Sequence, residues 1–210
     1  MVAKLRDVLL SDPGQRLAQF GFEADPGRVE KTDRTLVVYH YTHRDRLQVI
    51  TGIDGGLSAR LPVGDPCPPE IGGHFKVEGF LEPLPRWLKE SPYSGDLGWD
   101  LFRSDVGDVL LRVELPADFG GVYVADYAHV LERKHATHRG RTVLGLGYDC
   151  SNGRDCTRAF AYSYIPIQGY DGGHVAPVVQ MVREGPGLTI PSRFVSLSTT
   201  QPVMDGVQGN

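Results

Sequence analysis

The sequence predicts an α+β domain in which two small, mainly antiparallel sheets pack face to face around a cleft, with helices at the periphery. Two observations favour this class. The 210 residues include 26 glycines and 15 prolines, which is typical of short strands joined by many turns and unlike a helical bundle. Strand-like apolar runs recur along the chain, whereas helical patterns are confined to residues 2–20, 43–52 and 127–138.

The length suits a single catalytic-type domain, residues 1–210. We expect residues 1–27 to form an N-terminal helical segment and residues 200–210 to be a disordered tail. A hydrophobic content of 40% and a charged content of 23% describe an ordinary globular protein. The net charge of −4 disfavours broad electrostatic binding to nucleic acid, although it leaves room for a local basic patch.

The sequence also indicates where the protein is located and whether it binds a metal. No apolar stretch approaches the roughly 20 residues that span a bilayer, and the first apolar segment is too short for a signal peptide. We therefore expect no membrane partner and a location that is cytoplasmic in the producing cell, or outside it after signal-independent secretion. Cys67, Cys150 and Cys156 lack the paired spacing of a zinc site, so we expect no metal and free thiols. Cys150 and Cys156 could close a small disulfide loop in an oxidising compartment.

A strand is predicted to end in a corner that contains His40. Residues 35–39 are a β-branched and aromatic run long enough for a buried strand, and Thr42 follows as a predicted helix N-cap. His40 and Thr42 would then lie beside the free backbone N–H groups of a helix start, where both side chains could hydrogen-bond a ribose or an amide. The spacing alone equally allows Thr42 to be only a cap and His40 only a strand-end histidine.

The helix after this corner is predicted over residues 43–52. Leu47 and Ile50 fall on one face of two turns, and residues 54–56, Asp-Gly-Gly, would end it.

Several further elements are predicted from apolar patterns and turn residues. The proline-rich residues 61–70 are expected to be a loop, and Asn152-Gly153 is a strong turn signal. Phe160, Tyr162 and Tyr164 alternate, which in a strand would place all three side chains on one face, as a core or a stacking surface, and we expect Phe160 in the core. The remaining predicted strands are residues 109–115, 121–126 and 142–148, and a strand-turn-strand unit that contains residues 174–182 and 189–195.

Residues 39–57, YHYTHRDRLQVITGIDGGL, resemble the opening motif of bacterial ADP-ribosyltransferases that modify DNA in toxin/antitoxin pairs. They are similar, more loosely, to the openings of RNA 2'-phosphotransferases and poly(ADP-ribose) polymerases. The resemblance implies an ADP-ribosyltransferase-like fold with NAD as a substrate. It implies that His40 holds the nicotinamide ribose as a catalytic and NAD-binding residue, with Tyr41 and Thr42 beside it. Gly56 and Leu57 match the Gly-Leu that closes the motif.

Two later residues join the predicted NAD site. Related transferases pair an arginine with the dinucleotide phosphates, and Arg86 is the nearest candidate, although it could equally be a surface arginine next to Trp87. Residues 121–126, GVYVAD, are similar to a stretch of poly(ADP-ribose) polymerases. This similarity implies that Tyr123 lies near the nicotinamide pocket, whereas in a plain strand it would be core.

The glutamate that the family uses to hold the ribose 2'-hydroxyl is replaced by Pro177 when residues 174–182 are matched to the family pattern. Proline has no side-chain hydrogen-bonding group. We predict that His174 takes the catalytic place beside His40, because the preceding GYDGG lets backbone approach a ligand closely. The other candidates are Gln180, Glu184, Glu132 and Asn152.

The resemblance therefore implies a mono-ADP-ribosyltransferase that cleaves NAD and transfers ADP-ribose to a macromolecular acceptor, as a toxin or effector. The acceptor stays open among DNA, RNA and protein. Pro177 motivates an alternative, a non-catalytic module that binds NAD or ADP-ribose. An RNA 2'-phosphotransferase is a third reading, for which only Arg44, Arg46 and Arg60 offer nearby positive charge.

Overall fold

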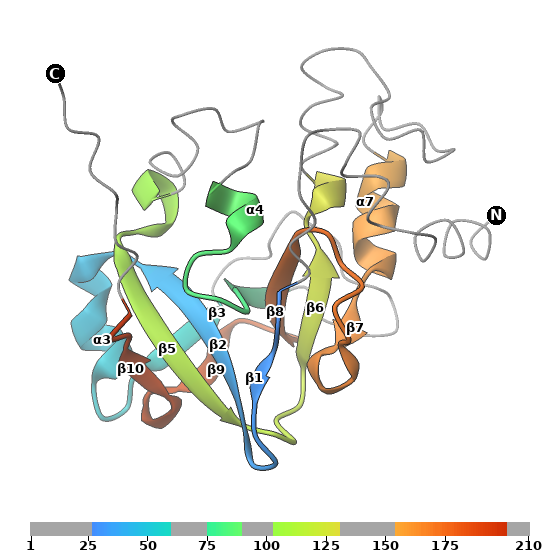
Figure 1. The fold of residues 1–210 in the computed structure, drawn as a ribbon. Coiled ribbons are helices and arrows are strands. Elements are labelled where there is room, and N and C mark those ends of the chain that lie inside the picture. Colours follow the sequence, from blue (N-terminus) through green and yellow to red (C-terminus); the bar gives the residue numbers. More distant parts are fainter. Residues whose placement is uncertain (1–26, 60–74, 90–102, 131–153, 201–210) are drawn as a thin grey trace, which may run out of the picture.

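The computed structural model describes residues 27–59, 75–89, 103–130 and 154–200, and these form a mixed α+β fold with antiparallel sheets (Figure 1). One sheet has the order β1-β2-β5-β10 and the other β4-β8-β6-β7, while β3 pairs with β9. The predicted α+β class with mainly antiparallel sheets is therefore confirmed. The strands are β1 (Glu30–Lys31), β2 (Thr35–Thr42), β3 (Gly56–Ala59), β4 (Phe75–Gly79), β5 (Val109–Pro116), β6 (Val122–Asp126), β7 (Ile165–Pro166), β8 (Pro177–Arg183), β9 (Gly187–Pro191) and β10 (Val195–Leu197).

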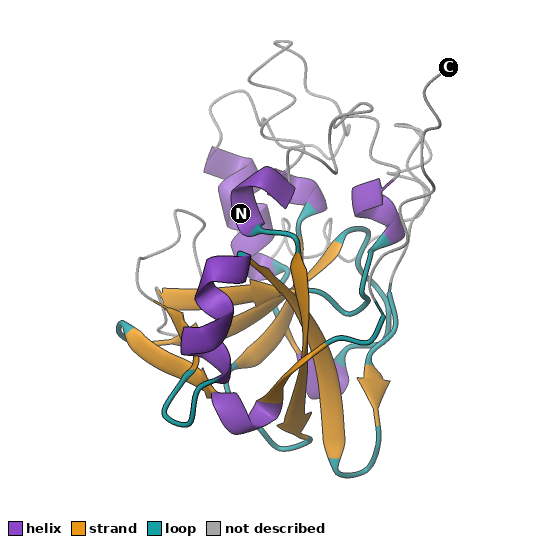
Figure 2. Cartoon of the chain, turned by 90° about the vertical axis from the view of Figure 1, so that its left-hand side faces the viewer, coloured by secondary structure: helices purple, strands orange, loops and turns teal. Residues whose placement is uncertain are grey.

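The helices are short and surround the strands (Figure 2). No helix in the described part of the chain is long and apolar enough to cross a membrane. The helical elements are η1 (Arg44–Arg46), α3 (Leu47–Thr51), α4 (Arg86–Lys89), α7 (Arg154–Tyr162), η4 (Ile167–Gly169) and η5 (Ser192–Phe194).

Alternation along the strands divides the apolar side chains into two cores. Leu36 and Val38 of β2 share one core with Val179 and Met181 of β8, so residues of both four-stranded sheets contribute to it. The neighbouring residues of β2, Val37, Tyr39 and Tyr41, belong to a second core. That core also contains Trp87 of α4 and Phe160 of α7, which explains why these two helices lie against the sheets.

The two sheets meet where β2 passes residue 80. Tyr39 and Phe80 exchange both backbone hydrogen bonds, with N···O distances of 2.9 and 2.7 Å. Gly79 makes this approach possible, because a Cβ on it would lie 2.7 Å from Val38 Cγ1 and 2.8 Å from the Tyr39 carbonyl oxygen.

The predicted strands near residues 109–115 and 121–126 are confirmed as β5 and β6, and the predicted final unit contains β8, β9 and β10. The predicted helix over 43–52 is present as η1 and α3, with Ile50 buried. The first strand is longer than predicted, because β5 supplies partners as far as the Thr42–Val109 pair. Thr42 is therefore a strand residue, and the prediction that it caps the helix is wrong: His43 occupies the N-cap of η1.

Phe160 lies in the core as predicted, but residues 154–162 form α7, so Phe160 and Tyr162 do not alternate along a strand. Tertiary packing overrides the strand preference of aromatic residues here. Phe160 is fully buried and packs edge-to-face on Tyr127, 6.2 Å between ring centroids. His174 precedes β8 and therefore lies outside the strand that contains Gln180.

Other predictions lie outside the described residues. They are the segment 1–27 except Gly27, the loop 61–70, the helix 127–138 beyond residue 130, the strand 142–148, the Asn152-Gly153 turn, Arg60, Glu132, the side chains of Cys67, Cys150 and Cys156, and the tail after Thr200.

Candidate functional site

His40 lies near the end of β2, half-buried, and its ring is oriented by a hydrogen bond to β4. His40 Nδ1 is 2.6 Å from the carbonyl oxygen of Glu78. A carbonyl can only accept, so Nδ1 carries the proton and the neutral ring keeps Nε2 as an acceptor. Burial lowers the pKa of His40, and the bond to Glu78 opposes this only in part. His40 is therefore a neutral imidazole at pH 7 that can accept a hydrogen bond from a ligand hydroxyl or amide.

The position of the ring follows from the strand register. In the register set by the Tyr39–Phe80 pair, His40 lies beside Gly79, which has no side chain to compete for the space. Glu78 and Gly79 face opposite sides of β4. The Glu78 carboxylate therefore lies on the face of β4 opposite to that of Gly79, where it accepts from Gln180.

Tyr41 and Thr42 are buried and hold the end of β2 in place. The Tyr41 hydroxyl donates to the carbonyl of Pro83, and the Tyr41 ring packs edge-to-face on Phe80, 6.0 Å between centroids. Burial raises the pKa of Tyr41, so its hydroxyl stays protonated and continues to donate. Thr42 lies against the backbone of Gly107, where a Cβ would be 2.1 Å from the Thr42 carbonyl carbon.

Gly56 and Leu57 begin β3 and pair with β9. Gly56 has a φ of +145° and must be glycine, because a Cβ would lie 2.1 Å from the carbonyl oxygen of Ile190. Leu57 is buried in the core that both sheets share. The structure thus gives both residues a packing role. Their predicted NAD contact stays a prediction.

Tyr123 lies in a row of side chains that crosses the second sheet. Tyr123 is paired with Gln180, and Gln180 with Glu78. Gln180 is fully buried, and its Nε2 donates to Glu78 Oε1 over 3.0 Å, whereas its Oε1 has no hydrogen-bond partner within the described ranges. The Tyr123 ring is 6.0 Å from that of Tyr164. The sequence did not identify Glu78, because only the pairing of β4 with β8 brings it to Gln180.

His174 is buried beside β6 and its ring is held by hydrogen bonding and packing. His174 Nε2 is 3.2 Å from the carbonyl oxygen of Val124, and the ring packs 5.1 Å from that of Tyr170. His40 hydrogen-bonds to β4 and His174 to β6, and β8 lies between these two strands in the sheet. The two predicted catalytic histidines are thus anchored to different strands.

Asp126 organises the chain around His174. Its Oδ1 accepts from the backbone N–H groups of Ala128 and Ala176 over 3.1 and 3.0 Å, and its Oδ2 accepts from that of Val175 over 3.2 Å. Burial alone would raise the pKa of Asp126. The nearby His129 and His174, together with the backbone donors, outweigh burial and leave that pKa below its usual value.

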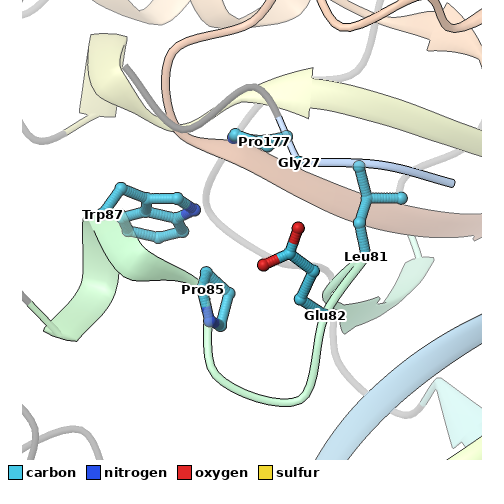
Figure 3. A pocket seen from close by; sticks show the side chains of 6 residues that line it. All are labelled: Gly27, Leu81, Glu82, Pro85, Trp87 and Pro177. Carbon is cyan, nitrogen blue, oxygen red and sulfur yellow. The ribbon is translucent and has the colours of Figure 1, made fainter. Parts of the chain in front are cut away.

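The place predicted for the family glutamate is tightly packed. Pro177, Trp87 and Glu82 surround a cavity of about 10 Å³, the size of one water molecule (Figure 3). The indole N–H of Trp87 is buried and has no hydrogen-bond partner in the described part of the chain. Gly27 closes the cavity, since a Cβ on it would lie 3.2 Å from Pro177 Cγ.

Of the other candidates, Arg86 is exposed on α4 and Glu184 is exposed in the turn after β8. No group of three or more His, Cys, Asp or Glu residues in the described ranges could hold a metal ion. His40 lines neither the cavity at Pro177 nor a groove of about 460 Å³ beyond the far end of β8.

Comparison of the chain with protein-family models, curated proteins and solved structures finds no match.

Proposed function

We propose that this protein is an NAD-dependent mono-ADP-ribosyltransferase of an ADP-ribosyltransferase-like fold. The observation that carries the proposal is the state of His40: a neutral imidazole at the end of β2, inside the motif of residues 39–57, with Nε2 as its remaining acceptor. The 2'-hydroxyl of the nicotinamide ribose is a donor that fits such an acceptor. An imidazole that binds this hydroxyl would orient the ribose whose C1' loses nicotinamide.

The mixed α+β architecture with antiparallel sheets supports the proposal, because it agrees with the fold class that the motif implies. The proposal leaves open which residue replaces the carboxylate that the family uses in the reaction. Pro177 cannot supply one, and the buried His174 is committed to Val124 and Tyr170. A transferase without that carboxylate would depend on geometry to hold ribose and acceptor, and would favour an acceptor that is already nucleophilic.

Nicotinamide release from NAD tests the proposal. We expect release by the wild-type protein and none by His40→Ala. Loss of one ring-to-carbonyl bond should lower the melting temperature by only about 2 to 4 °C. His43→Ala is the matched control, because His43 Nε2 makes the same kind of bond, 3.1 Å to the carbonyl of Asp105. Equal release by the His40 and His43 variants would show that the motif has been misread.

The acceptor is sought with NAD labelled in its adenylate moiety, offered together with DNA, RNA or protein. Label on one class identifies it and supports transfer. Binding of NAD without nicotinamide release would favour the second candidate function, an NAD or ADP-ribose-binding module, which the packing around Pro177 favours. Removal of an RNA 2'-phosphate would favour the phosphotransferase. No interaction of the wild-type protein with NAD would refute the transferase and the module together.

A further inference from the structure

A groove of about 460 Å³ lies between the turn that joins β5 to β6 and the turn that joins β8 to β9. β5 runs from Val109, opposite Thr42, to Pro116, opposite Thr35, and the groove begins just beyond Pro116, at Phe119. The β5–β6 turn lies at the bottom of Figure 1. The groove is therefore at the opposite end of β5 from His40, and its volume falls in the range of small-molecule sites.

Arg183 is the cation among the residues that line this groove, and it forms no ion pair with the described residues. Its Nη1 donates to the carbonyl of Leu188, while its Nε is buried and has no hydrogen-bond partner among the described residues. The ion pairs of the described residues join Arg44 to Asp108 and Arg112 to two glutamates, and none of them involves Arg183. A guanidinium that has no carboxylate partner among the described residues favours an oxyanion, to which its N–H groups can donate.

The guanidinium is held in a fixed place. The guanidinium lies against the backbone of Gly187, which has a φ of +135°. A Cβ on residue 187 would be 3.2 Å from Arg183 Nη1. The bond from Nη1 to Leu188 fixes one side of the guanidinium, and Nη2 makes no hydrogen bond to the described residues, so Nη2 is left to donate to a ligand.

Two glycines that line the groove could carry a side chain without steric conflict or backbone strain. Gly120 and Gly185 have no φ in the left-handed region, and a Cβ on either would meet nothing within 4 Å. The space above them is therefore open, and the absence of a side chain keeps it so. By contrast, Gly121 in the same groove has a φ of +75°, and a Cβ on it would lie 2.9 Å from the carbonyl oxygen of Val182.

The remaining lining residues narrow the ligand class. Leu188 is 46% exposed and offers an apolar wall. Glu184 adds a negative charge next to Arg183, which opposes a polyanion such as a nucleic-acid backbone. A small ligand with one oxyanion and an apolar part meets both conditions.

We propose that the groove around Arg183 is a second ligand site, separate from His40, which binds the phosphate or carboxylate of a small molecule above Gly120 and Gly185.

Titration calorimetry and backbone NMR of the full chain test this site, with inorganic phosphate and acetate as probes. We expect saturable binding of one or both probes, with NMR shifts centred on residues 119–121 and 183–189. Arg183→Gln should weaken binding by about tenfold or more. Gly120→Ala should weaken it similarly while leaving the melting temperature unchanged or slightly raised, because the added methyl enters open space. Gly169→Ala is the matched control, since a Cβ there also meets nothing within 4 Å but lies outside the groove.

Tighter binding of phosphate identifies a phosphate ester as the ligand class, and tighter binding of acetate identifies a carboxylate. Absence of binding of both probes to the wild-type protein overturns the proposal. So does full binding by Arg183→Gln, or by Gly120→Ala with an intact fold. The Gly120 variant keeps the test decisive if Arg183→Gln fails to fold. Nicotinamide release is measured in a separate assay, so neither presence nor absence of probe binding changes the test of the proposed transferase.

Discussion

Asp126→Ala is expected to be among the most destabilising single substitutions in the described part of the chain. The carboxylate is 6% exposed and accepts three backbone hydrogen bonds of 3.0 to 3.2 Å, two of them from residues 175 and 176 just before β8. Alanine leaves these three N–H groups without an acceptor and His129 and His174 without their neighbouring negative charge. Removal of one partner from a buried charged network costs about 3 to 5 kcal/mol.

Urea denaturation followed by tryptophan fluorescence measures this loss, because Trp87 packs 5.9 Å from the ring of Tyr127, next to Asp126. We expect a free energy of unfolding about 3 to 5 kcal/mol below the wild-type value at pH 7. Asp45→Ala, at an exposed aspartate in η1, is the control and should stay within about 0.5 kcal/mol. A loss below about 1 kcal/mol for Asp126→Ala would falsify the inference that Asp126 holds the start of β8.

The pH dependence of Asp126→Ala follows from the same carboxylate. The pKa of Asp126 is lower in the folded protein than its usual value, so its stabilisation is complete above the unfolded pKa of about 3.9. It is lost as pH falls through the folded pKa. The difference between wild type and Asp126→Ala should therefore shrink below about pH 4. A difference that grows on acidification would contradict this account.

Two further substitutions test the joint between the sheets and the charges on β1. Gly79→Ala should lower the free energy of unfolding by about 1 to 3 kcal/mol in the same urea assay. The reason is that the added Cβ would overlap Val38 Cγ1 and the Tyr39 carbonyl. A variant as stable as the wild-type protein would disprove the close approach of β2 and β4. Glu30→Ala removes a 2.7 Å ion pair with Arg112, but Glu30 is 53% exposed, so we expect a loss of at most about 1 kcal/mol that fades in high salt; a salt-independent loss would contradict a surface ion pair.

Much of the strand framework was predictable because its signals are local. Residues 109–115 form a continuous apolar run that needs no knowledge of its partners to be recognised as a strand, and β5 lies within one residue of the prediction. The pair Leu47 and Ile50 likewise predicted α3, since both side chains must share one face. The wrong predictions concern residues whose secondary structure depends on a partner distant in the sequence. Thr42 was predicted to cap a helix, but Val109 draws it into β2.

The candidate site was predictable only in part for the same reason. The motif of residues 39–57 identified His40 as a strand-end histidine, and β2 places it there. It could not predict that His40 Nδ1 bonds to Glu78, 38 residues away. Nor could it predict that Asp126 fixes the segment before β8, or that Arg183 meets the β5–β6 turn, since these contacts depend on how the sheets are ordered.

The sequence by itself determined the α+β class, the main strands and the histidine at the strand end, because side-chain periodicity and turn residues act over a few neighbouring positions. Tertiary structure alone decided the protonated nitrogen of His40, the helix at residues 154–162, the burial of His174 and the open groove beside Arg183. Each of these depends on a partner brought close by strand pairing or by packing between the sheets and the helices. Because these partners are distant in the sequence, local sequence patterns do not identify them.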